Sequence, residues 1–252
     1  MQLRDVIAPL LSLAVIIFLW HIASTIVNQP YLFPPPENVA VAFARLFFER
    51  NLCFHMFLTL CRVLAGFILG VALGFLIGFL VSLNYFLRSS LYPYIVFVAV
   101  TPSIAFIPLL MLWIGLNDLL PIVAIMICVA FPLTYSIISS MKNLDPEIIG
   151  VARTLGARRR DLVLRIILPL SLTHVASALK IEAGHGWRIG FITEYLALST
   201  GLGALMYFSY ATLRVDEIIA LIIIIGVLAL GFQLVIEKIE SMITRKWGLG
   251  KQ

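Results

Sequence analysis

The stretch Leu144–Pro169, LDPEIIGVARTLGARRRDLVLRIILP, is the longest segment between the apolar blocks that is not itself built to lie in lipid. It carries five of the chain's 18 Lys and Arg residues. Asp145 followed by Pro146 predicts a helix start, because an N-cap acceptor then precedes a proline suited to the first helical position. Gly156 predicts the end of that helix, since glycine accepts the left-handed conformation. A second short helix is expected over 157–167, giving a basic hairpin whose expected role is to dock on another protein.

The composition is that of an integral membrane protein. Hydrophobic residues make up 62% and charged residues 12% of the 252 residues, and the mean hydropathy is +1.06. Soluble domains have roughly 25% charged residues. Apolar blocks long enough to cross a bilayer as helices recur along the chain, which predicts an all-α fold with about six transmembrane helices. The predicted spans are 6–27, 57–83, 92–114, 119–140, 170–196 and 218–239, with the hairpin 145–168 between the fourth and fifth.

A further helix is expected between the first two spans. Residues 37–50 have apolar side chains at helical spacing, with Glu37, Arg45, Glu49 and Arg50 between them. This pattern is typical of an amphipathic helix that lies on the membrane surface.

The basic residues predict the orientation. With six spans, Arg4, Arg88, the arginines of 153–165 and the 238–251 tail all fall on one side. The positive-inside rule makes that side cytoplasmic. We therefore expect a multi-pass protein of the cell's inner, or plasma, membrane, with the hairpin and both termini in the cytoplasm.

Glycines and prolines mark two of the spans. In the second span, Gly66, Gly70, Gly74 and Gly78 recur every fourth residue on one helix face, where another helix can approach closely. Two interpretations stay open, a seam along which helices slide during transport and a static packing surface. The third span is interrupted by Pro93, Pro102 and Pro108, which predicts a bent or broken helix.

The fifth span is far more polar than the others. His174, Glu182, His185 and Arg188 fall within an arc of roughly 120° at 100° per residue, and such an arc can line an aqueous translocation path. For an anionic solute, Arg188 and a protonated His185 would lower the barrier. Glu194 is a candidate gate residue near the outer mouth. The alternative is that these groups, Glu182 in particular, only specify packing.

The hairpin resembles the cytoplasmic coupling loop of ABC importer permeases, whose pattern is E-A-A, three residues, G, nine residues and I-x-L-P. Gly156 takes the glycine position, and residues 166–169 supply the final I-x-L-P. Ala152 is the second alanine, whereas Gly150 and Val151 stand in place of the Glu and the first Ala. The ARTLGA segment resembles the subfamily that imports nitrate, taurine, alkanesulfonates and similar solutes.

The resemblance implies a type I ABC importer permease fold and a mechanism. It implies a homodimer, a cytoplasmic ABC ATPase dimer that binds ATP and Mg, and an extracytoplasmic substrate-binding protein. Membrane lipid surrounds the assembly, and nucleic acid is not expected as a partner. The residues implied in coupling to the ATPase are Glu147, Ile148, Val151, Ala152, Arg153, Leu155, Gly156, Ala157, Arg158 and Arg159.

The sequence contains no motif for chemistry. It has no phosphate-binding loop, no nucleophile elbow and no paired-Cys or His-Glu-x-x-His motif, so we expect no catalytic residue, no metal site and no cofactor in this chain. ATP-driven transport by this chain would therefore require a separate ATPase subunit. Two other functions stay open, an ion- or proton-coupled carrier that uses Glu182, His185 and Arg188, and a membrane scaffold.

Overall fold

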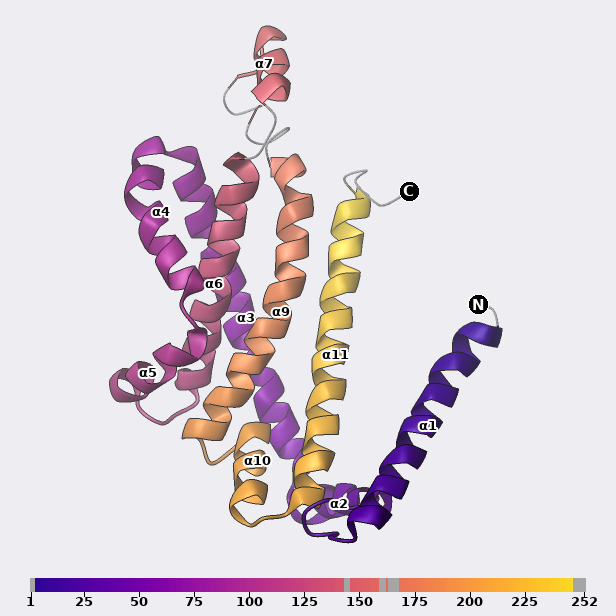
Figure 1. The fold of residues 1–252 in the computed structure, drawn as a ribbon. Helices are drawn as coiled ribbons and strands as arrows, with labels where there is room; N and C mark the ends of the chain where they lie inside the picture. Colours follow the sequence, from indigo (N-terminus) through magenta and orange to yellow (C-terminus); the bar gives the residue numbers. More distant parts are fainter. Residues whose placement is uncertain (1–2, 143–145, 159–161, 163–167, 247–252) are drawn as a thin grey trace.

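The computed structural model describes residues 3–142, 146–158, 162 and 168–246. Regular secondary structure in these ranges is entirely helical, and the helices form an elongated bundle (Figure 1). The elements are α1 (Leu3–Val27), α2 (Pro36–Glu49), α3 (Leu52–Leu83), α4 (Tyr85–Val100), the 3-10 helix η1 (Ser103–Phe106), α5 (Ile107–Ile114), α6 (Leu119–Lys142), α7 (Pro146–Thr154), α9 (Leu168–Ala197), α10 (Leu202–Ala211) and α11 (Val215–Lys246).

Four of the described helices, α1, α3, α6 and α11, are individually long and apolar enough to cross a membrane. Two bent pairs raise the number to six if each pair is one span. The first pair is α4 with η1 and α5, bent by 97°, and the second is α9 with α10, bent by 48°. The segment predicted as one span over 92–114 is therefore two helices at nearly a right angle. The break falls at Thr101 and Pro102, where proline cannot donate the backbone hydrogen bond that a continuous helix needs.

The surface helix predicted over 37–50 is present as α2. It lies across the ends of α1, α3 and α11 rather than along them (Figure 1). Its buried side chains are Val39, Ala42 and Leu46, at a spacing of three and four residues, while Phe48 is exposed. A helix with one apolar face of this kind packs that face on the bundle and leaves the other free.

The centre of the bundle is a close-packed seam between α3, α6 and α9. A Cβ built on Gly66 would lie 2.7 Å from the Ile125 Cβ, and one on Gly70 would lie 2.8 Å from the Val129 Cβ. From the other side, a Cβ on Gly190 of α9 would lie 3.0 Å from Ile125 Cδ1. The side chain of Ile125 therefore occupies space that glycines on two different helices leave free. These contacts make the glycine repeat the packing surface of α6, and a sliding role for it stays a prediction.

Helix α10 was not predicted from the sequence. Its ten residues are too few to cross a bilayer, and the segment was expected only to be a connection beyond the fifth span. Leu202, Leu205, Met206 and Ser209 are buried, and their spacing of three and four residues makes one face of the helix. Figure 1 places α10 at the same end of the bundle as α2, whereas α7 projects from the opposite end.

Candidate functional site

The end of α7 has the geometry that the glycine predicted. Gly156 has a φ of +82°, in the left-handed region. The Ala157 N–H donates to the Ala152 carbonyl at 3.0 Å, and this bond across five residues is the signature of a Schellman cap. The predicted left-handed conformation of Gly156 is confirmed. The turn fixes the direction in which the chain leaves α7.

Two large apolar side chains are exposed on α7 and the turn that follows it. Val151 is 59% exposed and Leu155 is 83% exposed, whereas Ala152 between them is buried. Large apolar side chains on a projecting helix suit the groove of a partner protein, because binding removes their apolar surface from water. Glu147 and Arg158 are also exposed on this segment.

Part of the predicted hairpin is not described. Arg159 and most of the second predicted helix lie outside the described residues, as does the predicted N-cap at Asp145. The side chains of Ile148, Arg153 and His174 likewise lie outside the described part of the structure. The coupling roles of the ten hairpin residues stay predictions.

The polar arc of α9 divides into a buried part and an exposed part. Glu182 is 5% exposed and turned into the bundle, and one of its carboxylate oxygens lies 3.3 Å from Nδ1 of His185. The His185 side chain is 43% exposed. Glu182 therefore has a partner on its own helix, and the packing role left open for it fits this position.

Arg188 is on the exposed side of α9. A Cβ on Gly184, one turn earlier, would lie 3.6 Å from an Arg188 guanidinium nitrogen, so the side chain lies back over this glycine. An exposed arginine in the middle of a span is expensive in lipid and is expected to face water or a partner. The role of His174, Glu182, His185, Arg188 and Glu194 on a translocation path stays a prediction.

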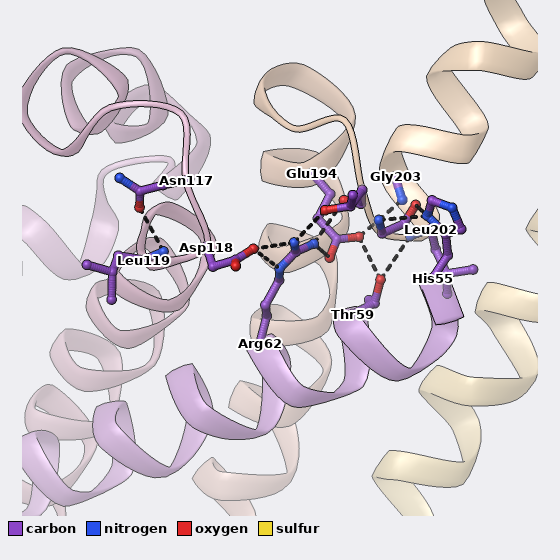
Figure 2. A network of polar contacts seen from close by, with 11 residues as sticks. His55, Thr59, Arg62, Asn117, Asp118, Leu119, Glu194, Leu202 and Gly203 are labelled. Atoms are coloured by element: carbon purple, nitrogen blue, oxygen red, sulfur yellow. Dashed lines mark hydrogen bonds and ion pairs between the residues drawn. The ribbon is translucent and has the colours of Figure 1, made fainter. Parts of the chain in front are cut away.

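Glu194 is the buried centre of a network that we call the polar clamp, made of Thr59, Arg62, Asp118, Glu194 and the turn 199–203 (Figure 2). Glu194 is only 1% exposed. Its Oε2 atom accepts from the Thr59 hydroxyl at 2.7 Å and from the Gly203 N–H at 3.2 Å. The Thr59 hydroxyl in turn accepts from the Leu202 N–H at 2.9 Å. The clamp thus ties the first turn of α10 to α3.

Arg62 supplies the positive charge of the clamp. Its Nη1 atom donates to Glu194 Oε1 at 2.7 Å and to the Thr200 carbonyl at 2.9 Å. Its Nη2 atom donates to the Thr200 hydroxyl at 2.7 Å, and the guanidinium also binds the carboxylate of Asp118. An arginine near the end of a span often extends toward the membrane surface. Arg62 does not, because its side chain is 4% exposed and its partner Glu194 is buried in the bundle, although Asp118 is exposed.

The glycine turn after α9 is shaped around the Glu194 carboxylate. Gly201 has a φ of +106°, and a Cβ there would overlap that carboxylate. A Cβ on Gly203 would overlap the Phe191 carbonyl oxygen. The Gly201 N–H also donates to His55 Nδ1 at 2.9 Å. Any side chain at either glycine would push the turn off the clamp.

Sequence reasoning found Glu194 but missed its partners Thr59 and Arg62, and missed Asp118 as the second carboxylate bound to Arg62. One signal was available, because an arginine within an otherwise apolar span is expected to have a specific partner. The partner itself could not be identified, since Glu194 is 132 positions away in the chain.

Comparison with known proteins identifies the family. Residues 70–247 match the model of the family described as binding-protein-dependent transport system inner membrane component. The chain belongs to this family. It is thus a permease of the ABC transporter class and an inner membrane component.

Curated relatives cover nearly all of the permease. A putative ABC transporter permease of Methanocaldococcus jannaschii is 29% identical over 91% of this chain and 87% of that protein. The taurine transport system permease TauC of Escherichia coli is 26% identical over 96% of this chain and 90% of its own length. The putative aliphatic sulfonates transport permease SsuC of Bacillus subtilis is 26% identical over 86% of this chain and 79% of its own length.

Solved structures show the same fold. A chain of the MetNI methionine ABC transporter in an inward-facing conformation superposes with a TM-score of 0.65 at 17% identity, covering 78% of the permease and 97% of that chain. A chain of a bacterial alginate ABC transporter gives a TM-score of 0.59 at 16% identity, covering 99% of both. The predicted fold class, an all-α, type I ABC importer permease, is confirmed.

Proposed function

We propose that this permease imports a small anionic solute of the sulfonate class, driven by ATP hydrolysis on a separate subunit. The observation that carries the ATP-driven role is α7. It projects from one end of the bundle, presents the exposed side chain of Val151, and is followed by exposed Leu155 and a hydrogen-bonded turn at Gly156. An element that transmits force between two proteins needs both an accessible apolar surface and a fixed direction.

The chain does no chemistry itself in this mechanism. Two copies related by a two-fold axis present two α7 helices to two ATPase subunits. Closure of the ATPases on ATP, with Mg, draws the α7 helices together and opens the interface between the copies on the opposite side. An extracytoplasmic binding protein delivers the solute there. Both termini and α7 then lie in the cytoplasm.

The sulfonate class is supported by the names of relatives, and the negative charge of the solute by the side chains on α9. TauC and SsuC, which carry taurine and aliphatic sulfonates in their names, align with more than four fifths of this chain. Arg188 is exposed on α9, with His185 nearby on the same helix, and a fixed positive charge lowers the barrier for an anion in a low-dielectric path. Nitrate and bicarbonate carry the same charge as an alkanesulfonate and are the alternatives among small anions.

The test is reconstitution of the permease in liposomes with the ATPase that co-purifies with it and the cognate binding protein. Taurine or an alkanesulfonate should stimulate ATP hydrolysis and uptake, and a cationic solute of similar size should not. Arg188→Ala should lower uptake while the ATPase still co-purifies, and Arg188→Lys should retain more of it. Uptake unchanged by Arg188→Ala would remove this residue from the path.

A carrier is the second candidate, because the Glu182–His185 pair in the middle of α9 could exchange a proton. The same liposomes distinguish the two functions. A carrier takes up solute under an ion or proton gradient without ATP or ATPase, and the proposed importer does not.

A further inference from the structure

The exposed face of α9 extends from Ser177 to the α10 end of the helix. Ser177, Ile181 and Arg188 are exposed, and Tyr195 is partly exposed. Steps of four and seven residues place these four side chains on one side of a helix with 3.6 residues per turn. Because an exposed arginine in this face is costly in lipid, the face is expected to border water. Tyr195 stands at its outer end, about 10 Å along the helix from Arg188 at 1.5 Å per residue.

Tyr195 is covered there by a side chain of α10. The rings of Tyr195 and Tyr207 meet edge to face, with their centroids 5.6 Å apart. Both rings line a hollow of about 550 Å³, together with Ser199 and Phe208. The end of the α9 face is thus occupied by two phenol rings beside a space large enough for a small solute.

The helix that carries Tyr207 is held in place by the polar clamp. The N–H groups of Leu202 and Gly203, in the first turn of α10, donate to Thr59 and Glu194. Leu202, Leu205 and Met206 are buried beneath α10. Tyr207 therefore projects from a fixed helix, and its position against Tyr195 is set by the hydrogen bonds and buried side chains that hold α10.

We propose that Tyr195 and Tyr207 close the translocation path at its α10 end, and that α10 and the polar clamp hold Tyr207 in position. The proposal rests on the proposed function in one respect, since it assumes that the face of α9 that carries Arg188 lines the translocation path. The chemistry of the closure suits an anion. Phenol hydroxyls donate hydrogen bonds, and the edges of aromatic rings carry the positive part of the ring quadrupole. An oxyanion that parts the two rings meets donors and ring edges before it reaches Arg188.

Tyrosines also gather at membrane interfaces without any role in passage. Tyr210 supplies the matched control for this alternative. It lies on the same helix, one turn beyond Tyr207, and is 59% exposed against 54% for Tyr207. It is not among the residues that line the hollow. A role at the membrane interface predicts that removing either tyrosine has the same effect on access to Arg188. A closure predicts that only the removal of Tyr207 increases this access.

The experiment measures access to the path without any solute. In a background in which Cys53, Cys61 and Cys128 are replaced by Ala, Arg188→Cys is the only thiol, and the assembled complex without ATP is exposed to a membrane-impermeant thiol reagent from the α10 side. Tyr207→Ala should raise the labelling rate several-fold, and Tyr195→Ala should do the same. Tyr207→Phe, which keeps the ring contact, and Tyr210→Ala should leave the rate close to that of the parent. The melting temperature of each variant shows whether it is folded.

Each outcome either supports or overturns the proposed closure. Equal labelling rates in Tyr207→Ala and Tyr210→Ala, whether raised or unchanged, would overturn the closure. Absence of labelling in every variant, even with the ATPases trapped by a non-hydrolysable ATP analogue, would remove Arg188 from the path and overturn the proposal with it. Selective labelling in Tyr207→Ala, combined with no sulfonate-stimulated ATP hydrolysis in the complex that retains Arg188, would support the closure and refute the solute assignment.

Discussion

Arg62 and Glu194 are 132 positions apart in the chain, yet Arg62 Nη1 donates to Glu194 Oε1 at 2.7 Å. Their side chains are 4% and 1% exposed, so the two charges neutralise each other away from water. Burial makes each charge dependent on the other, because an unpaired charge in a low-dielectric interior is far more costly than a paired one.

Glu194→Ala should destabilise the protein by about 3–5 kcal/mol, since it leaves the Arg62 charge buried without its partner. Thermal unfolding of the purified protein in detergent measures this. Asp118→Ala is the control, because Asp118 also binds Arg62 but its side chain is 74% exposed. Its loss should cost no more than about 1 kcal/mol, because Asp118 is exposed and Arg62 keeps its bonds to Glu194 and Thr200. Equal losses in the two variants would show that burial is not what makes the Arg62–Glu194 pair important.

Gly70→Ala should destabilise the protein by about 1–3 kcal/mol through overpacking. The added Cβ would lie 2.8 Å from the Val129 Cβ and 2.9 Å from the Met126 carbonyl oxygen. Gly226→Ala on α11 is the matched control, because nothing lies within 4 Å of its added Cβ. That change should be neutral or stabilising by up to about 1 kcal/mol, the difference in helix propensity between glycine and alanine. If the two variants unfold at the same temperature, the seam is looser than the contacts indicate.

Gly156→Ala should weaken co-purification of the ATPase and reduce solute-stimulated ATP hydrolysis. The added methyl group meets open space, so the effect comes from the φ of +82°, which costs an L-residue roughly 1–2 kcal/mol and favours a different exit from α7. Gly150→Ala is the control within the same helix. Its added Cβ also meets nothing within 4 Å, and its φ lies outside the left-handed region. Normal coupling in both Gly156→Ala and Gly156→Val would remove the turn from the mechanism.

Cysteines at Arg158 and Asn117 should be labelled from opposite sides of the membrane in a background without the native cysteines. The reason is the distribution of Arg and Lys, which places the segment after α7 in the cytoplasm and the turn before α6 outside. Both sites are exposed, so an impermeant thiol reagent can reach them in intact cells or inverted vesicles. Labelling of both from one side would refute the topology.

The local features of the fold could be predicted from the sequence. Long apolar blocks predict spanning helices, and the spacing of Val39, Ala42 and Leu46 predicts a surface helix. The glycine at 156 predicts a left-handed turn, because the conformation is a property of that residue alone. In each case the evidence lies within a few turns of the chain.

The features that depend on distant partners could not be predicted. Nothing near Arg62 in the sequence indicates that its partners are Asp118, Glu194 and Thr200. The helical arc on α9 has the expected period, but which of its side chains turn inward depends on where α6 packs. Helix α10 gains its stability from burial against α9 and α11, and its own ten residues carry no signal strong enough to identify it.

The polar clamp also has a consequence for counting membrane crossings. It holds together the end of α3 that carries Arg62, the turn before α6 at Asp118 and the turn after α9 at Thr200, so all three connections belong to one face of the bundle. The chain leaves that face along α3 and is back on it at Asp118. The segment 85–114 must therefore cross from the opposite face back to the face of the clamp. It does so although its 97° bend leaves neither α4 nor α5 as a complete span. Parity alone then places α7 on the face opposite the clamp, independently of any charge rule.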